Sequence, residues 1–230
     1  MRRSFVVLLL AWLTISAGYQ PNQVSAAECI NLPPTRLHVY NIDVPQSREE
    51  VIPAAELSRK IPADGLVSLH SMMVTIRNLV SWVRIQHRAV PQANGTVCDA
   101  PEVVDVGLGS DLRKTLIADS IADDVCVRRQ LQEHEGMHSL AFGNTVDRFI
   151  AENETIFREG MVALKKTAAP SFEKASARWS RGVQLIIDRS KQALLADLQK
   201  ANSHVDSPET LKRLALACDG KIQNLEQGQF

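Results

Sequence analysis

The chain has 230 residues, 45% of them hydrophobic and 23% charged, and its 26 basic and 26 acidic side chains give a formal net charge of +0. This balance leaves no basic excess that would bind nucleic acid or an anionic membrane, so we expect neither as a partner. The length suits one domain with an appendage, and we expect a monomer.

The first 27 residues have the pattern of a secretory signal peptide. Two arginines follow Met1, residues 5–15 are almost entirely apolar, and residues 24–27 supply small side chains for cleavage. The apolar run of about 11 residues is too short to cross a bilayer of about 30 Å, so we expect cleavage rather than anchoring. No later stretch is long and apolar enough to cross, which predicts a soluble protein in the periplasm or outside a bacterial cell.

The cysteines agree with export. Four remain after cleavage, and an even number in an exported chain predicts two disulfides. Of the three possible connectivities we favour Cys98–Cys126 with Cys29–Cys218, because the first pair flanks one compact segment and the second lies near the mature termini. A cysteine zinc site is excluded, since the chain has no C-x-x-C pair.

The first elements after the signal peptide are short. Residues 36–42 alternate in a run rich in strand formers and predict a strand, and residues 54–60 predict a helical turn. Residues 65–83 carry apolar side chains at helical spacing, although the β-branched density near their end also suits a strand. We expect a helix to about Asn78.

A pair of strands follows. Residues 81–88 are rich in strand formers, Asn94-Gly95 is a turn signal, and residues 96–108 contain enough valine for a second strand. Pairing of the two predicts a small antiparallel sheet just before residue 123.

From Asp123 onward the pattern is helical. The first helix is expected to begin near Asp123 or Asp124, since carboxylates favour a helix start. Gly143 could end this helix, or the helix could continue through it at a cost of about 1 kcal/mol. Further helices are expected over residues 146–166, 172–202 and 208–218. The elements together predict an α+β fold, with a small antiparallel sheet packed on a mostly helical body and a long helical C-terminal half.

Residues 134–138 of the first helix read His-Glu-Gly-Met-His, the pattern H-E-x-x-H. Side chains four apart on a helix project from nearly the same side, so His134 and His138 can bind one metal ion. Glu135 lies one step round the helix, within reach of a water on that metal. With 6 histidines and 13 glutamates in the chain, about 0.01 matches are expected by chance.

This pattern indicates zinc-dependent hydrolysis. Imidazole is a good zinc ligand, and a hydrolytic zinc keeps three protein ligands and one open position for water. Zinc lowers the pKa of that water to about 7, and a carboxylate at Glu135 would take its proton and return it to the leaving amine. We therefore expect one zinc per chain, held by His134 and His138, and peptide bonds as the substrate.

The third ligand stays open. The extended pattern with a later glycine and histidine is excluded, because Ala141 and Asn144 occupy those positions. If Gly143 breaks the helix, Asp147 or Glu154 becomes available; if the helix is continuous, both point away and the ligand must come from another segment. The remaining candidates are Glu152, Glu159, His38, His70, His87 and His204.

The motif within a helix resembles the zincin superfamily of metallopeptidases. The wider segment 98–149, with VVDVGL at 103–108 and Cys126 eight residues before His134, resembles small secreted bacterial proteins described as predicted zinc-dependent proteases. The resemblance implies His134 and His138 as ligands and Glu135 as the catalytic residue, and it supplies no third ligand.

The resulting organisation is a signal peptide over 1–27, a zincin-like domain over 28–168 and a helical extension over 169–230. We expect an exported zinc peptidase acting on peptides or proteins. The alternatives are an inactive exported binding or scaffold protein that retains the motif, and a metal-binding protein without activity.

Overall fold

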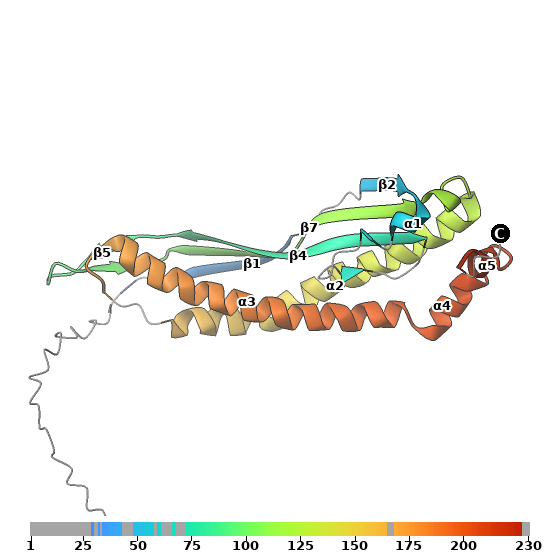
Figure 1. The fold of residues 1–230 in the computed structure, drawn as a ribbon. Helices are drawn as coiled ribbons and strands as arrows, with labels where there is room; N and C mark the ends of the chain where they lie inside the picture. The colour runs from blue at the N-terminus through green and yellow to red at the C-terminus, as the bar shows by residue number, and fades with distance from the viewer. Residues whose placement is uncertain are drawn as a thin grey trace, which may run out of the picture.

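The computed structural model describes residues 29, 32, 34–42, 48–57, 59–60, 66–67, 72–164 and 168–226. The predicted signal peptide and His70 lie outside these residues. The described part is elongated: a long sheet lies lengthwise on two long antiparallel helices, and two short helices close one end (Figure 1). The fold is α+β, as predicted. None of the described helices is long and apolar enough to span a membrane.

The sheet is built around two long strands, β4 (Met73–Gln86) and β7 (Val103–Ala118), which pair antiparallel as predicted for the two strands before the motif. On the other side of β7, β1 (Arg36–Ile42) and β2 (Arg48–Ile52) run parallel to it. The strand β3 (Leu66–Val67) pairs with β4. The predicted antiparallel pair is therefore the centre of a mixed sheet. At one end β5 (Ala89–Pro91) and β6 (Val97–Asp99) form a separate antiparallel pair.

The prediction of a helix up to Asn78 is wrong, because the strand β4 already begins at Met73. Both faces of this part of the sheet are covered: Val74 and Ile76 pack with Ile52 and Leu57 on one face, and Met73 joins a second cluster on the other. A strand buried on both faces shows a nearly continuous apolar run, which also matches a helical stripe.

The motif helix α2 (Val125–Ala163) is 39 residues long and starts where expected, with Asp124 as N-cap. The Asp124 carboxylate accepts a hydrogen bond from the Val127 amide at 3.1 Å. The helix is continuous through Gly143, where a side chain would meet nothing within 4 Å. Phe142 and Val146, on either side of this glycine, are both in the core, and their burial outweighs the modest helix penalty of one glycine.

The C-terminal half consists of α3 (Phe172–Val205), α4 (Pro208–Ala215) and α5 (Lys221–Glu226); a four-residue α1 (Ala54–Leu57) forms the predicted helical turn. The main core lies between the sheet and the helices α2 and α3, so segments 28–168 and 169–230 share one core. Its buried residues are Leu37, Val104, Val106, Leu108, Phe142, Val146, Phe149, Phe157, Met161, Trp179, Val183, Ile187, Leu194 and Leu198.

Two disulfides connect Cys29 to Cys98 and Cys126 to Cys218, so the predicted pairing is wrong. Cys98 is in β6 and Cys126 in the first turn of α2. Between them runs β7, whose 16 residues extend about 50 Å, so these two cysteines lie at opposite ends of the sheet. Two disulfides in one chain are typical of an oxidising compartment.

Candidate metal centre

The two motif histidines lie on the side of α2 that faces the end of α3. His134 is 1% exposed and His138 is 5% exposed. Their Nε2 atoms are 3.1 Å apart. The spacing of four residues thus brings two imidazole nitrogens to one point, as the sequence predicts.

Asp206 completes the cluster. Its Oδ1 atom lies 3.1 Å from Nε2 of His134 and 2.9 Å from Nε2 of His138. Asp206 is the C-cap residue of α3, and its backbone N–H donates to the carbonyl of Asn202. These three side chains form a group that could hold a metal ion within the described part of the chain.

The spacing of the three atoms fits a single small cation. A point equidistant from all three lies about 1.8 Å away from each, less than the 2.0–2.2 Å of a zinc–nitrogen or zinc–oxygen bond, so one ion can contact all three. Two imidazoles and one carboxylate are also a donor set found in hydrolytic zinc enzymes. The residues present therefore fit a zinc ion.

Asn202 orients His138, one of the candidate ligands. Its Oδ1 atom lies 3.2 Å from Nδ1 of His138. With that oxygen as acceptor, Nδ1 carries the proton and the lone pair of Nε2 points into the cluster, which is the tautomer a metal requires. Asn202 and Asp206 are four residues apart at the C-terminal end of α3, so this one segment supplies both a candidate ligand and a contact to another.

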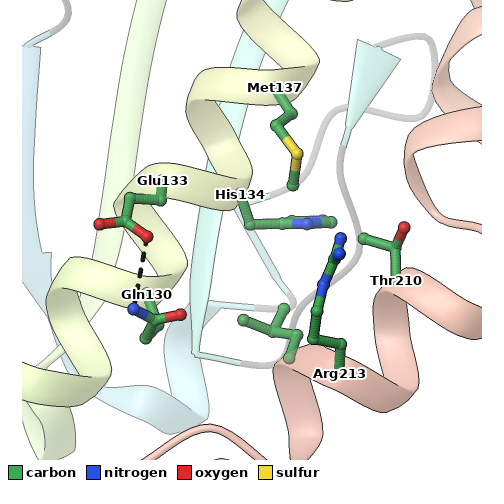
Figure 2. A pocket seen from close by; sticks show the side chains of 7 residues that line it. Gln130, Glu133, His134, Met137, Thr210 and Arg213 are labelled. Carbon is green, nitrogen blue, oxygen red and sulfur yellow. Dashed lines mark hydrogen bonds between the residues drawn. The ribbon is translucent and has the colours of Figure 1, made fainter.

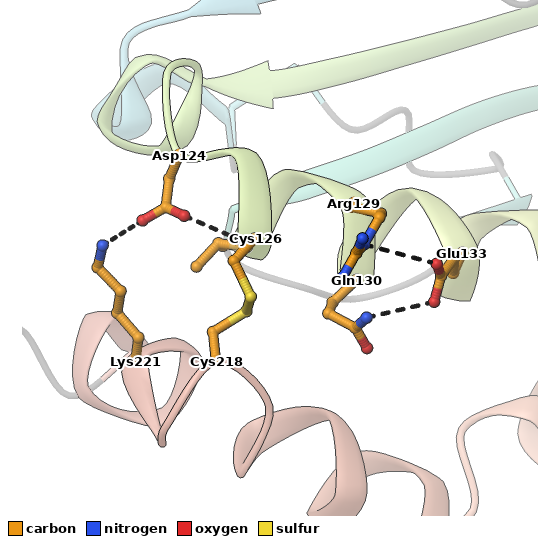
Figure 3. The surroundings of a disulfide bond; sticks show 8 residues. Asp124, Cys126, Arg129, Gln130, Glu133, Cys218 and Lys221 are labelled. Atoms are coloured by element: carbon orange, nitrogen blue, oxygen red, sulfur yellow. Dashed lines mark hydrogen bonds and ion pairs between the residues drawn. A yellow bond between two sulfur atoms is a disulfide. The ribbon is translucent and has the colours of Figure 1, made fainter.

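The end of α3 is held against α2 by the segment that follows. After Ser207 caps α4, Leu214 and Ile222 pack with Val127 and Leu131 of α2, in a second core beside the metal cluster. The disulfide from Cys126 to Cys218 fixes the same contact covalently (Figure 3).

An ion pair joins the same two regions. The Lys221 ammonium of α5 pairs with the carboxylate of Asp124, the N-cap of α2 (Figure 3). This hydrogen bond from Lys221, together with the amide of Val127, holds the pKa of Asp124 below its ordinary value of 3.8. The carboxylate is therefore charged over the whole neutral range and keeps α5 at the start of α2.

Glu135 is buried, with 5% of its surface exposed. It shares a side of α2 with Ser139, one turn further on, whose hydroxyl donates to the Glu135 carbonyl at 2.9 Å and accepts from Arg77 of β4 at 2.6 Å. Arg77 is itself buried and lies over the ring of Phe142 at 4.9 Å. The Glu135 side of α2 thus faces a polar part of the sheet, next to the side that carries the two histidines.

The other predicted ligands lie elsewhere. Because α2 is continuous, Asp147 and Glu154 point away from the histidines: Asp147 accepts from Asn41 at 2.9 Å and Glu154 pairs with Arg158 at 2.7 Å. Glu152 and Glu159 are exposed on α2. His38 is beside Asp105 and His87 beside Asp99, while His204 lines a groove between α2 and α3.

Two hollows lie along α2, and the smaller one includes a residue of the cluster in its lining. A pocket of about 270 Å³ lies between α2 and α4, with His134 in its wall (Figure 2). A groove of about 700 Å³ runs between α2 and α3. Met137 and Thr210 line both, so the two hollows meet at these residues beside the histidines.

A scan of protein-family models, a search of curated proteins and a search of solved structures each found no match to this chain.

Proposed function

We propose that the protein is an exported zinc-dependent peptidase in which His134, His138 and Asp206 hold one zinc ion and Glu135 is the general base. The observation that carries the proposal is the convergence of two imidazole nitrogens and one carboxylate oxygen within 2.9–3.1 Å of one another. The sequence pattern accounts for the histidines, and the third group is Asp206, 68 residues after His138 at the end of α3.

The protein residues have distinct tasks in this proposal. A bound zinc would polarise the scissile carbonyl and make a neighbouring water more acidic. Glu135 takes the proton of the attacking water and transfers it to the leaving nitrogen. Its burial and its position next to His134 in the chain support this role. Asn202 keeps His138 in the ligating tautomer.

The hollows beside the cluster support a peptide as substrate. The pocket next to His134 and the groove along α2 meet at Met137 and Thr210, so an extended chain could lie in both with one bond near the histidines. Export is supported by the two disulfides and by the signal-peptide pattern of residues 1–27.

The test uses the protein purified in its oxidised form, loaded with zinc and dialysed. We expect about one zinc per chain by elemental analysis and hydrolysis of members of a broad peptide library. Glu135→Gln should retain zinc and lose hydrolysis by about 100-fold or more, since a general base contributes 10²–10⁴-fold. Glu159→Gln, on an exposed part of the same helix, is the matched control.

Two results would contradict the proposal. Absence of zinc after reconstitution would exclude the metal centre. Zinc binding without cleavage of any library member would favour a metal-binding protein without activity.

A further inference from the structure

Arg213 of α4 lines the same pocket as His134. Its side chain extends from α4 toward the imidazole of His134, between Met137 and Thr210 (Figure 2). A guanidinium group therefore lies beside a residue of the metal cluster, in a pocket whose wall is otherwise partly apolar through Met137 and Leu214.

This guanidinium has no hydrogen bond or ion pair to another of the described residues. The carboxylate of Glu133, which lines the same pocket, is occupied by Gln130 at 3.3 Å and by Arg129 at 3.9 Å. Asp206 is occupied by the two histidines. The N–H donors of Arg213 are thus available to an anion that enters the pocket.

The backbone of Arg213 is fixed even though its side chain is exposed. Leu214, the next residue, is 7% exposed and packs in the second core. Cys218, five residues after Arg213, is bonded to Cys126 of α2. The backbone from which this side chain extends is therefore fixed relative to the histidines, so the guanidinium stays within reach of the pocket.

We propose that Arg213 binds the C-terminal carboxylate of a peptide, so that the enzyme removes the last residue of its substrate. This inference rests on the proposed zinc peptidase function. Guanidinium groups bind carboxylates through two parallel hydrogen bonds, and Met137 and Leu214 supply an apolar wall for the terminal side chain. At about 270 Å³ the pocket lies near the lower end of the range for small-ligand sites, about 300–1,000 Å³, and has room for a single residue.

The groove of about 700 Å³ between α2 and α3 then takes the rest of the peptide. In the reaction one water is consumed: its oxygen bonds to the acyl carbon, the C–N bond breaks, and a proton passes through Glu135 to the nitrogen that leaves. The products are a shortened peptide and one free amino acid.

The first test compares two peptides of identical sequence, one ending in a carboxylate and one in a carboxamide. The zinc-loaded protein should cleave the free acid with a kcat/KM about 10- to 100-fold higher than that of the amide, the range expected for a hydrogen-bonded charge. Arg213→Gln should remove this preference by slowing cleavage of the free acid alone, and Arg213→Lys should retain part of it. Lys212→Gln, an exposed neighbour outside the pocket, is the matched control.

A binding measurement separates this inference from the proposed function. Calorimetric titration uses a mercaptoacyl dipeptide, whose thiol binds zinc, as free acid and as amide. Tighter binding of the free acid, lost in Arg213→Gln, supports the inference even for a protein that cleaves neither peptide. Equal binding of the two forms overturns it and leaves the zinc site intact. An equal loss of activity on both peptides in Arg213→Gln also overturns it, because Arg213 would then act on the reaction rather than on the carboxylate. Failure to bind zinc overturns both proposals.

Discussion

Asn202 in the last turn of α3 and Asp206, the C-cap residue of that helix, contact the two nitrogens of one imidazole. Asn202 Oδ1 lies 3.2 Å from Nδ1 of His138, and Asp206 Oδ1 lies 2.9 Å from its Nε2. The ring of His138 is therefore fixed at both ends by a single helical turn. Any displacement of that turn along α2 would move the Asp206 carboxylate and the Asn202 contact together.

Replacing Asp206 should abolish tight zinc binding. In Asp206→Ala one of the three ligands is missing, and we expect zinc affinity to fall by more than about 100-fold, beyond the 10- to 100-fold that loss of a supporting contact costs. Competition with a chromophoric chelator measures the affinity. Asp188→Asn, an exposed position on the same helix, should bind zinc like the parent. Unchanged affinity in Asp206→Ala would mean that the ion has a different third ligand.

Replacing Asn202 should have a smaller effect on the same measurement. Asn202→Leu removes the acceptor for the N–H at Nδ1 of His138. The neutral ring can then carry its proton on Nε2, where it leaves no lone pair for zinc. We expect a loss of about 10- to 100-fold in zinc affinity. The control is Gln199→Leu, an exposed position on α3. A variant with parental affinity would show that the Asn202 contact does not orient the ligand.

The two disulfides should differ in their effect on the metal centre. The Cys126–Cys218 bond joins residues 92 apart and encloses all three metal residues, and the chain-entropy model gives it about 4–5 kcal/mol of stabilisation. Cys126→Ala with Cys218→Ala should lower the denaturant midpoint and weaken zinc binding. Cys29→Ala with Cys98→Ala removes a bond at the other end of the sheet and should lower the midpoint with little change in zinc affinity. Equal zinc affinity in both double variants would contradict this assignment.

The ion pair between Asp124 and Lys221 predicts a pH dependence of stability. The pKa of Asp124 is lower in the folded state than its ordinary value of 3.8, chiefly because Lys221 donates to it. The stabilisation is therefore complete above pH about 4 and is lost as the pH falls through the folded-state pKa. With both proteins free of zinc, the parent should have a higher free energy of unfolding than Asp124→Asn at pH 7. This difference should shrink toward pH 2. Denaturant unfolding at several pH values measures it.

The control for this prediction is Asp123→Asn, because Asp123 is exposed next to the cap. This variant should follow the parent at every pH. A difference between parent and Asp124→Asn that is constant from pH 7 to pH 2 would show that the carboxylate charge does not contribute.

The features that depend on residues close together in the chain could be predicted from the sequence. The helical period brings His134 and His138 to the same side of α2, and the preference of carboxylates for helix starts located Asp124 within one residue. The antiparallel pairing of β4 and β7 also followed from two β-rich runs, although the Asn94-Gly95 turn lies between β5 and β6 and the predicted strand 96–108 is divided between β6 and β7. Each of these features is determined by interactions between residues close in the chain.

The position of Asp206 beside the histidines and the disulfide pairing were decided by tertiary structure. No spacing rule links His138 to Asp206, because their distance depends on where the antiparallel helix α3 begins relative to α2. That starting point is set by a bridge between Val97 of β6 and Ala169, just before α3. Once α3 is anchored there, its 34 residues return along α2 until its last turn meets the histidines and the following segment reaches Cys126. The sequence by itself brought two of the three candidate ligands together, because one helix carries them; packing between two helices brought Asp206 to them.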